Sequence, residues 1–147
     1  MKEKFLSDLK KLKEQKNGDE LQKSLYNIRK RLDDPNVLSG EVVLNMLFCF
    51  RDIQDYNAMV HLVDDLKTLP TTKKYVNSYI LYLYAFALNR RKQAGDRERA
   101  LNVCIEALKK VCWCSHVVLA LLFFCLLFLE RKSLSGYDMF VWQNLQR

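Results

Sequence analysis

The stretch from Tyr82 to Leu108 constrains the fold of this chain most strongly, because it reads as two apolar helical runs that flank a short polar turn. In the second run, apolar side chains recur at the i, i+3, i+4, i+7 spacing of one helix face, namely at Leu101, Cys104, Ile105 and Leu108. In the turn, Gly95 can take the left-handed conformation that ends a helix, and Asp96 can cap the next helix. The stretch therefore predicts an antiparallel helical hairpin.

A second copy of this pattern occurs earlier in the chain. Ser39 is a good N-cap for an apolar helix that runs from about Gly40 to Phe50, and Asp55 can cap the helix after it. Leu69 and Pro70 close that helix. Two such hairpins in series, with small residues and a Gly-Asp pair, are typical of tetratricopeptide-like repeats that stack into a solenoid. An ordinary antiparallel helix pair would give the same local pattern.

The remaining apolar stripes complete an all-α prediction. One helix carries Phe5, Leu6, Leu9 and Leu12, and the next runs from Leu21 to Leu32. After a short linker at 71–74, a fifth helix is predicted from about Tyr75 to Arg91, and a sixth from about Asp96 to Val111. The 147 residues include only four Gly and two Pro, a composition that favours long helices over a turn-rich β fold. We therefore expect one domain of stacked helical hairpins.

The net charge of the chain is +7 at pH 7. Residues 1–32 hold ten Lys or Arg against five Asp or Glu, and residues 90–110 hold seven against three. This balance suits an acidic protein partner, RNA or an anionic membrane surface, although ordinary solvated helix faces give the same composition. Aromatic residues are scarce among the N-terminal charges, so a stacking platform for nucleic acid is not predicted.

The five cysteines do not suggest a disulfide framework, because their number is odd and no signal peptide precedes them. A reducing, cytoplasmic compartment is the expectation. Cys112, Cys114 and His116 could supply metal ligands, but Cys-x-Cys without a second ligand pair indicates an adventitious cluster. His61 has Asp64 and Asp65 within helical reach but no evident nucleophile. We predict neither a metal, a cofactor, a small-molecule substrate nor a catalytic residue.

The composition changes abruptly after Lys110. The segment Val111–Leu129 is almost entirely apolar, and its length lies at the lower edge of the roughly 17 to 25 residues that cross a bilayer. It predicts a strongly hydrophobic C-terminal helix, at 111–132, that is buried in the protein, enters a membrane or aggregates. A single-pass or tail-anchored membrane protein is therefore an alternative to a cytoplasmic one. Residues 133–147 read as a mixed tail.

Several long motifs resemble one protein family. The motifs are Asp33-Asp34-Pro35 with Val37-Leu38-Ser39-Gly40, Arg51-Asp52-Ile53-Gln54-Asp55-Tyr56, Ala58-Met59-Val60 with Leu62-Val63, Leu69-Pro70-Thr71, Tyr84 to Arg91, and Gly95-Asp96-Arg97-Glu98. Together they are similar to the N-terminal regulatory region of the apoptosis signal-regulating kinases, a group of mitogen-activated protein kinase kinase kinases. The resemblance covers roughly residues 5–110 and corresponds to the tetratricopeptide-like TRAF-binding domain of these kinases. Beyond Lys110 the sequence departs from the family, so we expect a truncated piece of that region.

The resemblance implies an interaction module rather than an enzyme. It implies TRAF-type adaptors and the full-length kinase as partners. The kinase signatures, namely the Gly-rich loop, the His-Arg-Asp catalytic loop and Asp-Phe-Gly, are missing from the sequence. The candidate binding residues lie in the two turns that carry family motifs: Arg51, Asp52, Asp55, Tyr56, Asn89, Arg90, Arg91, Asp96 and Arg97. Arginine is enriched in interfaces, but these arginines could equally pair with the aspartates of the same turns.

Overall fold

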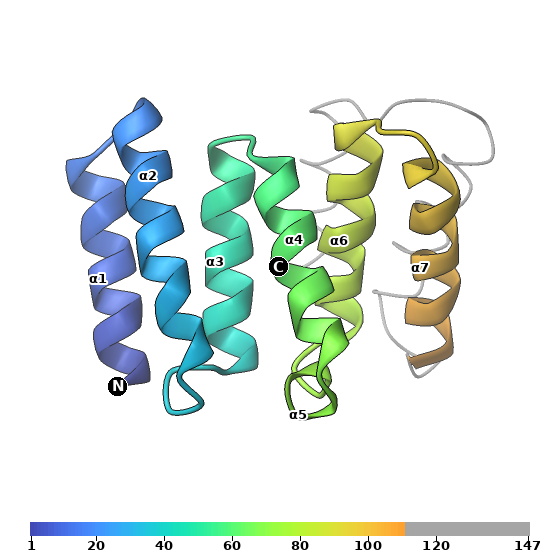
Figure 1. Ribbon diagram of the computed structural model, residues 1–147, viewed down its shortest axis with the longest axis horizontal. Coiled ribbons are helices and arrows are strands. Elements are labelled where there is room, and N and C mark those ends of the chain that lie inside the picture. The colour runs from blue at the N-terminus through green and yellow to red at the C-terminus, as the bar shows by residue number, and fades with distance from the viewer. Residues whose placement is uncertain (111–147) are drawn as a thin grey trace, which may run out of the picture. The chain divides into compact units, whose positions relative to one another are not determined.

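The computed structural model describes residues 1–110, and in this part it is all-helical without a strand, which confirms the predicted all-α class (Figure 1). The elements are α1 (Lys2–Gln15), α2 (Gly18–Arg29), the 3-10 helix η1 (Lys30–Asp33), α3 (Gly40–Asp52), α4 (Tyr56–Thr68), α5 (Pro70–Lys73), α6 (Ser78–Arg91) and α7 (Asp96–Lys110). None of these helices is long and apolar enough to cross a membrane. The predicted hydrophobic helix at 111–132 and the tail at 133–147 lie outside the described residues.

The chain divides into two compact units, of which the first is Met1–Val76. In this unit α1 and α2 form one antiparallel hairpin and α3 and α4 form a second, and α3 packs against both helices of the first hairpin (Figure 1). The core consists of large side chains that are fully buried, among them Phe5, Leu25, Met46, Leu47, Phe50 and Met59. Each such side chain contributes roughly 1.5–3 kcal/mol through burial, so the two hairpins share one hydrophobic interior.

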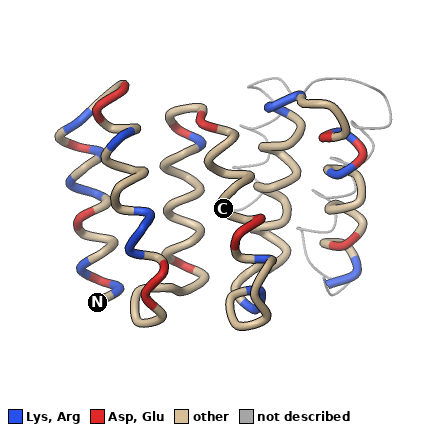
Figure 2. The backbone as a smooth tube through the Cα atoms, in the orientation of Figure 1, with Lys and Arg blue, Asp and Glu red and all other residues tan. Residues whose placement is uncertain are grey.

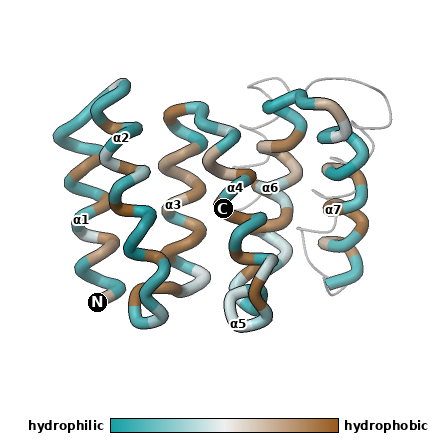
Figure 3. The backbone as a smooth tube through the Cα atoms, viewed as in Figure 1, coloured by the Kyte–Doolittle hydropathy of each residue, from teal (hydrophilic) through white to brown (hydrophobic). Residues whose placement is uncertain are grey.

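The predicted caps explain where α3 and α4 begin. The Ser39 hydroxyl accepts a hydrogen bond from the backbone N–H of Val42 at 3.2 Å, and the Asp55 carboxylate accepts one from Ala58 at 3.0 Å. Both caps confirm the sequence prediction. Helix α3 is more apolar than α1, α2 and α4, and apolar positions recur along it (Figure 3).

Two boundaries between Leu69 and Ser78 differ from the prediction. Pro70 begins the short helix α5, because its fixed φ suits the first helical position, so residues 71–74 are not a plain linker. The fifth predicted helix begins at Ser78 rather than Tyr75, because the Asn77 side chain accepts a hydrogen bond from the Ile80 N–H at 2.9 Å. An asparagine N-cap therefore sets this start.

The second unit begins at Asn77, and its described part is the hairpin of α6 and α7 (Figure 1). The side chains from Ile80 to Leu88 are all buried. Small residues occur on both helices, including the fully buried Ala85, Ala87, Ala100 and Ala107. Alanine has little bulk, so these residues permit a close approach of the two helices.

The turn and the buried stripe of this hairpin correct two details. The helix α6 ends at Arg91, where Lys92 takes the left-handed conformation with a φ of 57°, so Gly95 with a φ of 79° lies within the turn instead of ending the helix. The buried stripe of α7 is Ala100, Val103, Cys104 and Ala107, whereas Ile105 is 44% exposed. The predicted stripe was therefore right at Cys104 and wrong at Ile105, and the buried face includes the alanines at positions 100 and 107.

Candidate functional site

The first candidate site is the turn between α3 and α4. Arg51 and Asp52 end α3, Asp55 is the N-cap of α4, and Tyr56 is its first residue. Gln54 has a φ of 59°, a left-handed conformation that reverses the chain between the helices. The structure therefore brings these four predicted residues together at one end of the second hairpin.

The Asp55 carboxylate joins three parts of the first unit. It accepts hydrogen bonds from the Gln22 amide at 2.8 Å and from the Tyr26 hydroxyl at 2.9 Å, in addition to the capping N–H of Ala58. Burial, and after it the hydrogen bond to Asp55, raises the pKa of Tyr26. Gln22 and Tyr26 both lie on α2, so Asp55 ties α2 to the start of α4.

Asp52 forms the centre of a small charged cluster. Its carboxylate lies 2.9 Å from the Lys13 ammonium of α1 and 3.3 Å from the Arg51 guanidinium. The hydrogen bond to Asp52 raises the pKa of Lys13. The Arg51 guanidinium also lies over the Phe48 ring, 4.8 Å from its centroid. Together with Leu6, these residues line a groove of about 480 Å³ between α1 and α3.

The second candidate site is the turn between α6 and α7, where Arg91 and Asp96 form a bidentate pair. The Arg91 Nε donates to Asp96 Oδ2 at 2.9 Å and its Nη2 donates to Oδ1 at 2.7 Å, while the Gln93 N–H adds a third bond at 3.0 Å. The Arg91 side chain is 9% exposed and that of Asp96 is 2% exposed. The hydrogen bond from Arg91 is the main cause of the lowered pKa of Asp96. This buried pair links the last residue of α6 to the first residue of α7.

The other predicted residues of this turn differ in exposure. Arg97 is exposed, whereas Asn89 and Arg90 are half-buried. The Arg90 guanidinium lies 5.5 Å from the centroid of the Phe86 ring, and its Nε is buried without a hydrogen-bond partner among the described residues. Neither Arg90 nor Arg97 belongs to the Arg91–Asp96 pair.

Sequence reasoning did not identify Arg99 as part of the second turn. Its guanidinium donates to the Tyr84 hydroxyl and lies 3.9 Å from the Asp96 carboxylate. The spacing of three residues between Asp96 and Arg99 on one helix was the available signal. The contact with Tyr84 on α6 depends on the tertiary packing of the hairpin.

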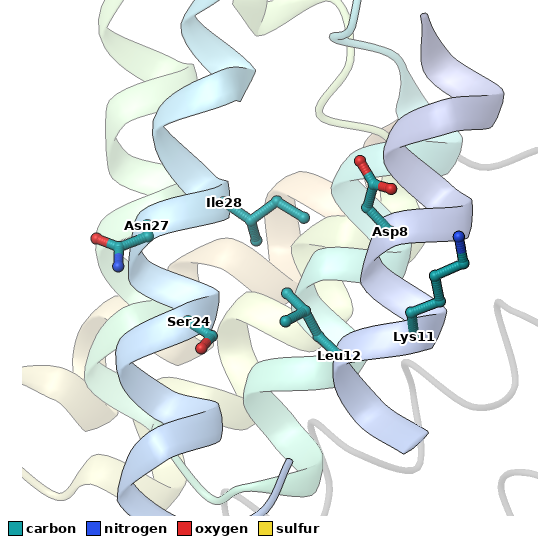
Figure 4. A pocket seen from close by; sticks show the side chains of 6 residues that line it. All are labelled: Asp8, Lys11, Leu12, Ser24, Asn27 and Ile28. Carbon is teal, nitrogen blue, oxygen red and sulfur yellow. The ribbon is translucent and has the colours of Figure 1, made fainter. Parts of the chain in front are cut away.

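A shallow cavity between α1 and α2 was also not predicted (Figure 4). Its volume is about 470 Å³, and it is lined by Asp8, Lys11, Leu12, Ser24, Asn27 and Ile28. The Asp8 carboxylate accepts a hydrogen bond from Arg31 at 2.7 Å, and this bond lowers the pKa of Asp8. The polar lining of the cavity therefore includes a side chain that already has a partner.

Among residues 1–110, no group of three or more His, Cys, Asp or Glu side chains lies close enough together to hold a metal ion. The Cys112–His116 cluster lies outside the described residues. Cys49 and Cys104 are buried, and His61 is exposed. Burial raises the pKa of Cys49 to about 11.

Comparison with known proteins adds a family to this geometry. A family model described as the MAP3K TRAFs-binding domain matches residues 1–126. The chain belongs to the MAP3K TRAFs-binding domain family. This confirms the resemblance inferred from the sequence motifs. The match passes Lys110 and includes part of the apolar run, while the domain boundary proposed at that residue stays a prediction.

The TRAFs-binding domain is similar to parts of several mitogen-activated protein kinase kinase kinases. The chain is 47% identical over 115 residues to mitogen-activated protein kinase kinase kinase 15 from Mus musculus. The aligned region covers 78% of the chain and 8% of this relative. It is 46% identical over 106 residues to nsy-1 of Caenorhabditis elegans, with coverage of 71% and 7%. For human kinase 5 the identity is 42% over 104 residues, with coverage of 71% and 8%. The chain thus spans less than a tenth of these relatives, and the matched region is a TRAFs-binding domain rather than a kinase domain.

Proposed function

We propose that the chain is a non-catalytic protein-interaction module from the regulatory region of a stress-activated kinase kinase kinase. Its proposed partners are TRAF-type adaptors and the full-length kinase, and its proposed compartment is the cytoplasm. The match to the MAP3K TRAFs-binding domain over residues 1–126 carries this proposal. The sequence lacks the phosphate-binding and catalytic motifs that phosphoryl transfer by a protein kinase requires.

The helical hairpins support this role. We propose that they belong to a tetratricopeptide-like repeat series, in which each hairpin buries one face on its neighbour and presents another to partners. The α3–α4 turn offers Arg51, and the α6–α7 turn offers Arg90 and Arg97, as charges for an acidic partner surface. Lys and Arg also recur along α1 (Figure 2), but they lie outside both turns, and the proposal assigns them no contact with the partner.

Capture of a purified TRAF adaptor by the full chain tests the proposal. We expect capture by the wild-type chain and a loss of about tenfold or more in affinity for Arg51→Glu and Arg90→Glu, because reversal of an interface charge places like charges together. Lys11→Glu is the matched control, since Lys11 is exposed on α1 outside both turns. Absence of capture by the wild-type chain would contradict the adaptor as partner.

Arg90 lies against Phe86, so a thermal melt accompanies each variant. A loss of binding counts only where the variant melts within a few degrees of the wild type. Capture that is equal in wild type and both reversals would exclude these turns as the binding surface.

Membrane attachment is a second candidate function, favoured by the apolar sequence of Val111–Leu129. This segment approaches the length that a spanning helix needs. Carbonate extraction of the expressed full chain separates the two functions. Recovery in the soluble fraction contradicts an anchor, and retention in the membrane pellet supports one.

A further inference from the structure

A larger cavity lies in the first unit, away from both candidate turns. Its volume is about 740 Å³, and its walls come from the end of α2, the segment that follows η1, the end of α4 and the region of α5. Four leucines with exposed fractions of 7% or less contribute to its lining: Leu32, Leu38, Leu62 and Leu66. The volume falls in the range of roughly 300–1,000 Å³ that is usual for ligand pockets.

The walls of this cavity are fixed by local hydrogen bonds. The Thr72 hydroxyl donates to the Leu66 carbonyl at 2.8 Å and lies 3.2 Å from that of Leu69. Pro70, which directly follows Leu69, is the first residue of α5. These contacts hold the end of α4 against α5, so a ligand would enter a site that is already formed.

One large apolar side chain of the cavity lining is exposed to solvent. Leu69 is 56% exposed, which is the highest exposure of a large hydrophobic side chain between residues 2 and 110. Tyr75 is half-buried beside it on the same cavity lining. Leu69 thus adds exposed apolar surface to the lining that contains the four buried leucines, here called the leucine floor, and such a lining suits apolar side chains of a ligand.

The charged groups of the cavity lining are two cations, Arg29 and Lys74, and two carboxylates, Asp33 and Asp65. The Arg29 guanidinium contacts the Asp65 carboxylate through Nη2, and its Nε is buried without a hydrogen-bond partner among residues 1–110. A guanidinium has five N–H donors, and for Arg29 the Nη2 group contacts Asp65 while the Nε–H has no acceptor in that range. Arg29 is therefore a half-buried cation whose Nε–H lacks a hydrogen-bond acceptor among residues 1–110.

Lys74 is the second cation. Its ammonium lies 5.1 Å from the centroid of the Tyr75 ring and forms no ion pair among the described residues. Asp33 is an exposed carboxylate on the lining that water can solvate. The demand for a charged partner is thus stronger at the guanidinium than at the carboxylates, because a buried donor without an acceptor is costly.

We propose that this cavity binds a peptide segment of a protein partner in which apolar side chains stand next to one acidic residue. The apolar side chains occupy the leucine floor, and the carboxylate accepts hydrogen bonds from Arg29 and attracts Lys74. Bidentate contact between guanidinium and carboxylate is the strong form of such a pair. The proposal rests on the interaction function above and adds a specific site and ligand chemistry to it.

A peptide fits these groups better than a nucleic acid does. Nucleic-acid affinity comes from many phosphate contacts along a row of cations. This cavity offers two cations, two carboxylates and an apolar floor, which suit one carboxylate on an apolar segment. A single-stranded RNA is therefore a competitor in the test rather than the expected ligand.

The test uses the full chain and two matched libraries of acetylated, amidated heptapeptides. Both contain Leu, Ile, Met or Phe at the positions that flank the centre, and the centre is Glu in one library and Gln in the other. We expect the Glu library to bind about tenfold or more tightly, since hydrogen bonds to charged groups contribute more than neutral ones. Arg29→Gln and Lys74→Gln should remove this difference, and Leu69→Ser should weaken both libraries.

Lys11→Gln is the matched control, because it removes one exposed cation of the same unit outside this cavity. It should bind both libraries as the wild type does. If Arg29→Gln fails to fold, Lys74→Gln decides the outcome, because Lys74 is exposed and its contact is to one ring. A melting curve of each variant identifies such a failure.

Three results would overturn the proposal: no binding of either library, equal binding of both by the wild type, or an unchanged preference for Glu in Lys74→Gln. The proposal would also be overturned if oligouridine RNA displaced the Glu peptides and the tighter binding of Glu over Gln peptides were lost. Adaptor capture is measured on the same variants. Capture without peptide binding leaves the proposed function intact and overturns only the cavity as its site.

Discussion

Asp55 shows how one side chain can serve two structural purposes. It caps α4 and accepts hydrogen bonds from two residues of α2, so it lies where the two hairpins of the first unit meet. The sequence predicted the cap, since aspartate precedes an apolar helical stripe. It did not predict the contacts to α2, because they join residues far apart in the chain.

Replacement of Asp55 by Ala should lower the free energy of unfolding by about 2–4 kcal/mol, since both a helix cap and hydrogen bonds to a charged acceptor are lost. Urea denaturation followed by circular dichroism measures the change. Glu14→Ala serves as control, because among residues 1–110 its only ion pair is an exposed contact with Lys10 at 4.0 Å, and it should change stability little. Equal midpoints for the two variants would contradict the role of Asp55.

Asp96 should make stability depend on acid. Its pKa is lowered in the folded protein by the hydrogen bond from Arg91, so its contribution is complete above the ordinary aspartate pKa of roughly 4 and is lost as pH falls through the lowered value. Between assay pH values of about 6 and about 3, the free energy of unfolding of the wild type should therefore fall more than that of Asp96→Asn. Parallel pH profiles of the two proteins would contradict this account.

At the scale of the helices, two N-caps were predicted correctly, whereas the Asn77 cap and part of the buried face of α7 were not. Ser39, Asp55 and the residues around them specify helix starts through local hydrogen bonds, and these starts were confirmed. The buried face of α7 depends instead on how closely α6 approaches, which periodicity alone does not reveal. Larger side chains at Leu101 and Ile105 therefore suggested the wrong stripe.

Overpacking the alanine seam should destabilise the hairpin of α6 and α7. Ala107 is fully buried, so Ala107→Leu should cost about 1–3 kcal/mol, because extra methylenes in a packed seam displace their neighbours. Thermal unfolding measures this loss. Ile105→Ser is the informative control, since Ile105 is 44% exposed and its replacement should cost less. A larger effect at Ile105 would restore the predicted stripe.

The cavity near α5 could not be predicted from the sequence, because its lining residues form no recognisable sequence motif. Its lining comes from segments on either side of α3, and only the packing of the two hairpins places them around one space. The two candidate turns were found because each is a continuous motif. Local motifs can therefore be predicted, whereas sites that combine separate segments need the tertiary structure.

At the scale of the whole chain, the division after Val76 makes a prediction about folding. The first unit has its own core and two complete hairpins. Residues 1–76 expressed alone should therefore give a helical circular dichroism spectrum and a cooperative thermal transition. A spectrum of an unfolded chain, or a melt without a transition, would show that the first unit depends on the rest of the protein.

The burial of Cys49 has a consequence for chemical reactivity. Only a thiolate attacks an alkylating reagent efficiently, and a pKa of about 11 keeps this sulfur protonated at neutral pH. Iodoacetamide should therefore reach Cys49 only when α3 detaches from its neighbours. The rate at which mass spectrometry detects the Cys49 adduct would therefore report transient opening of the first unit. Alkylation of the folded protein as fast as in urea would show that burial does not protect this thiol.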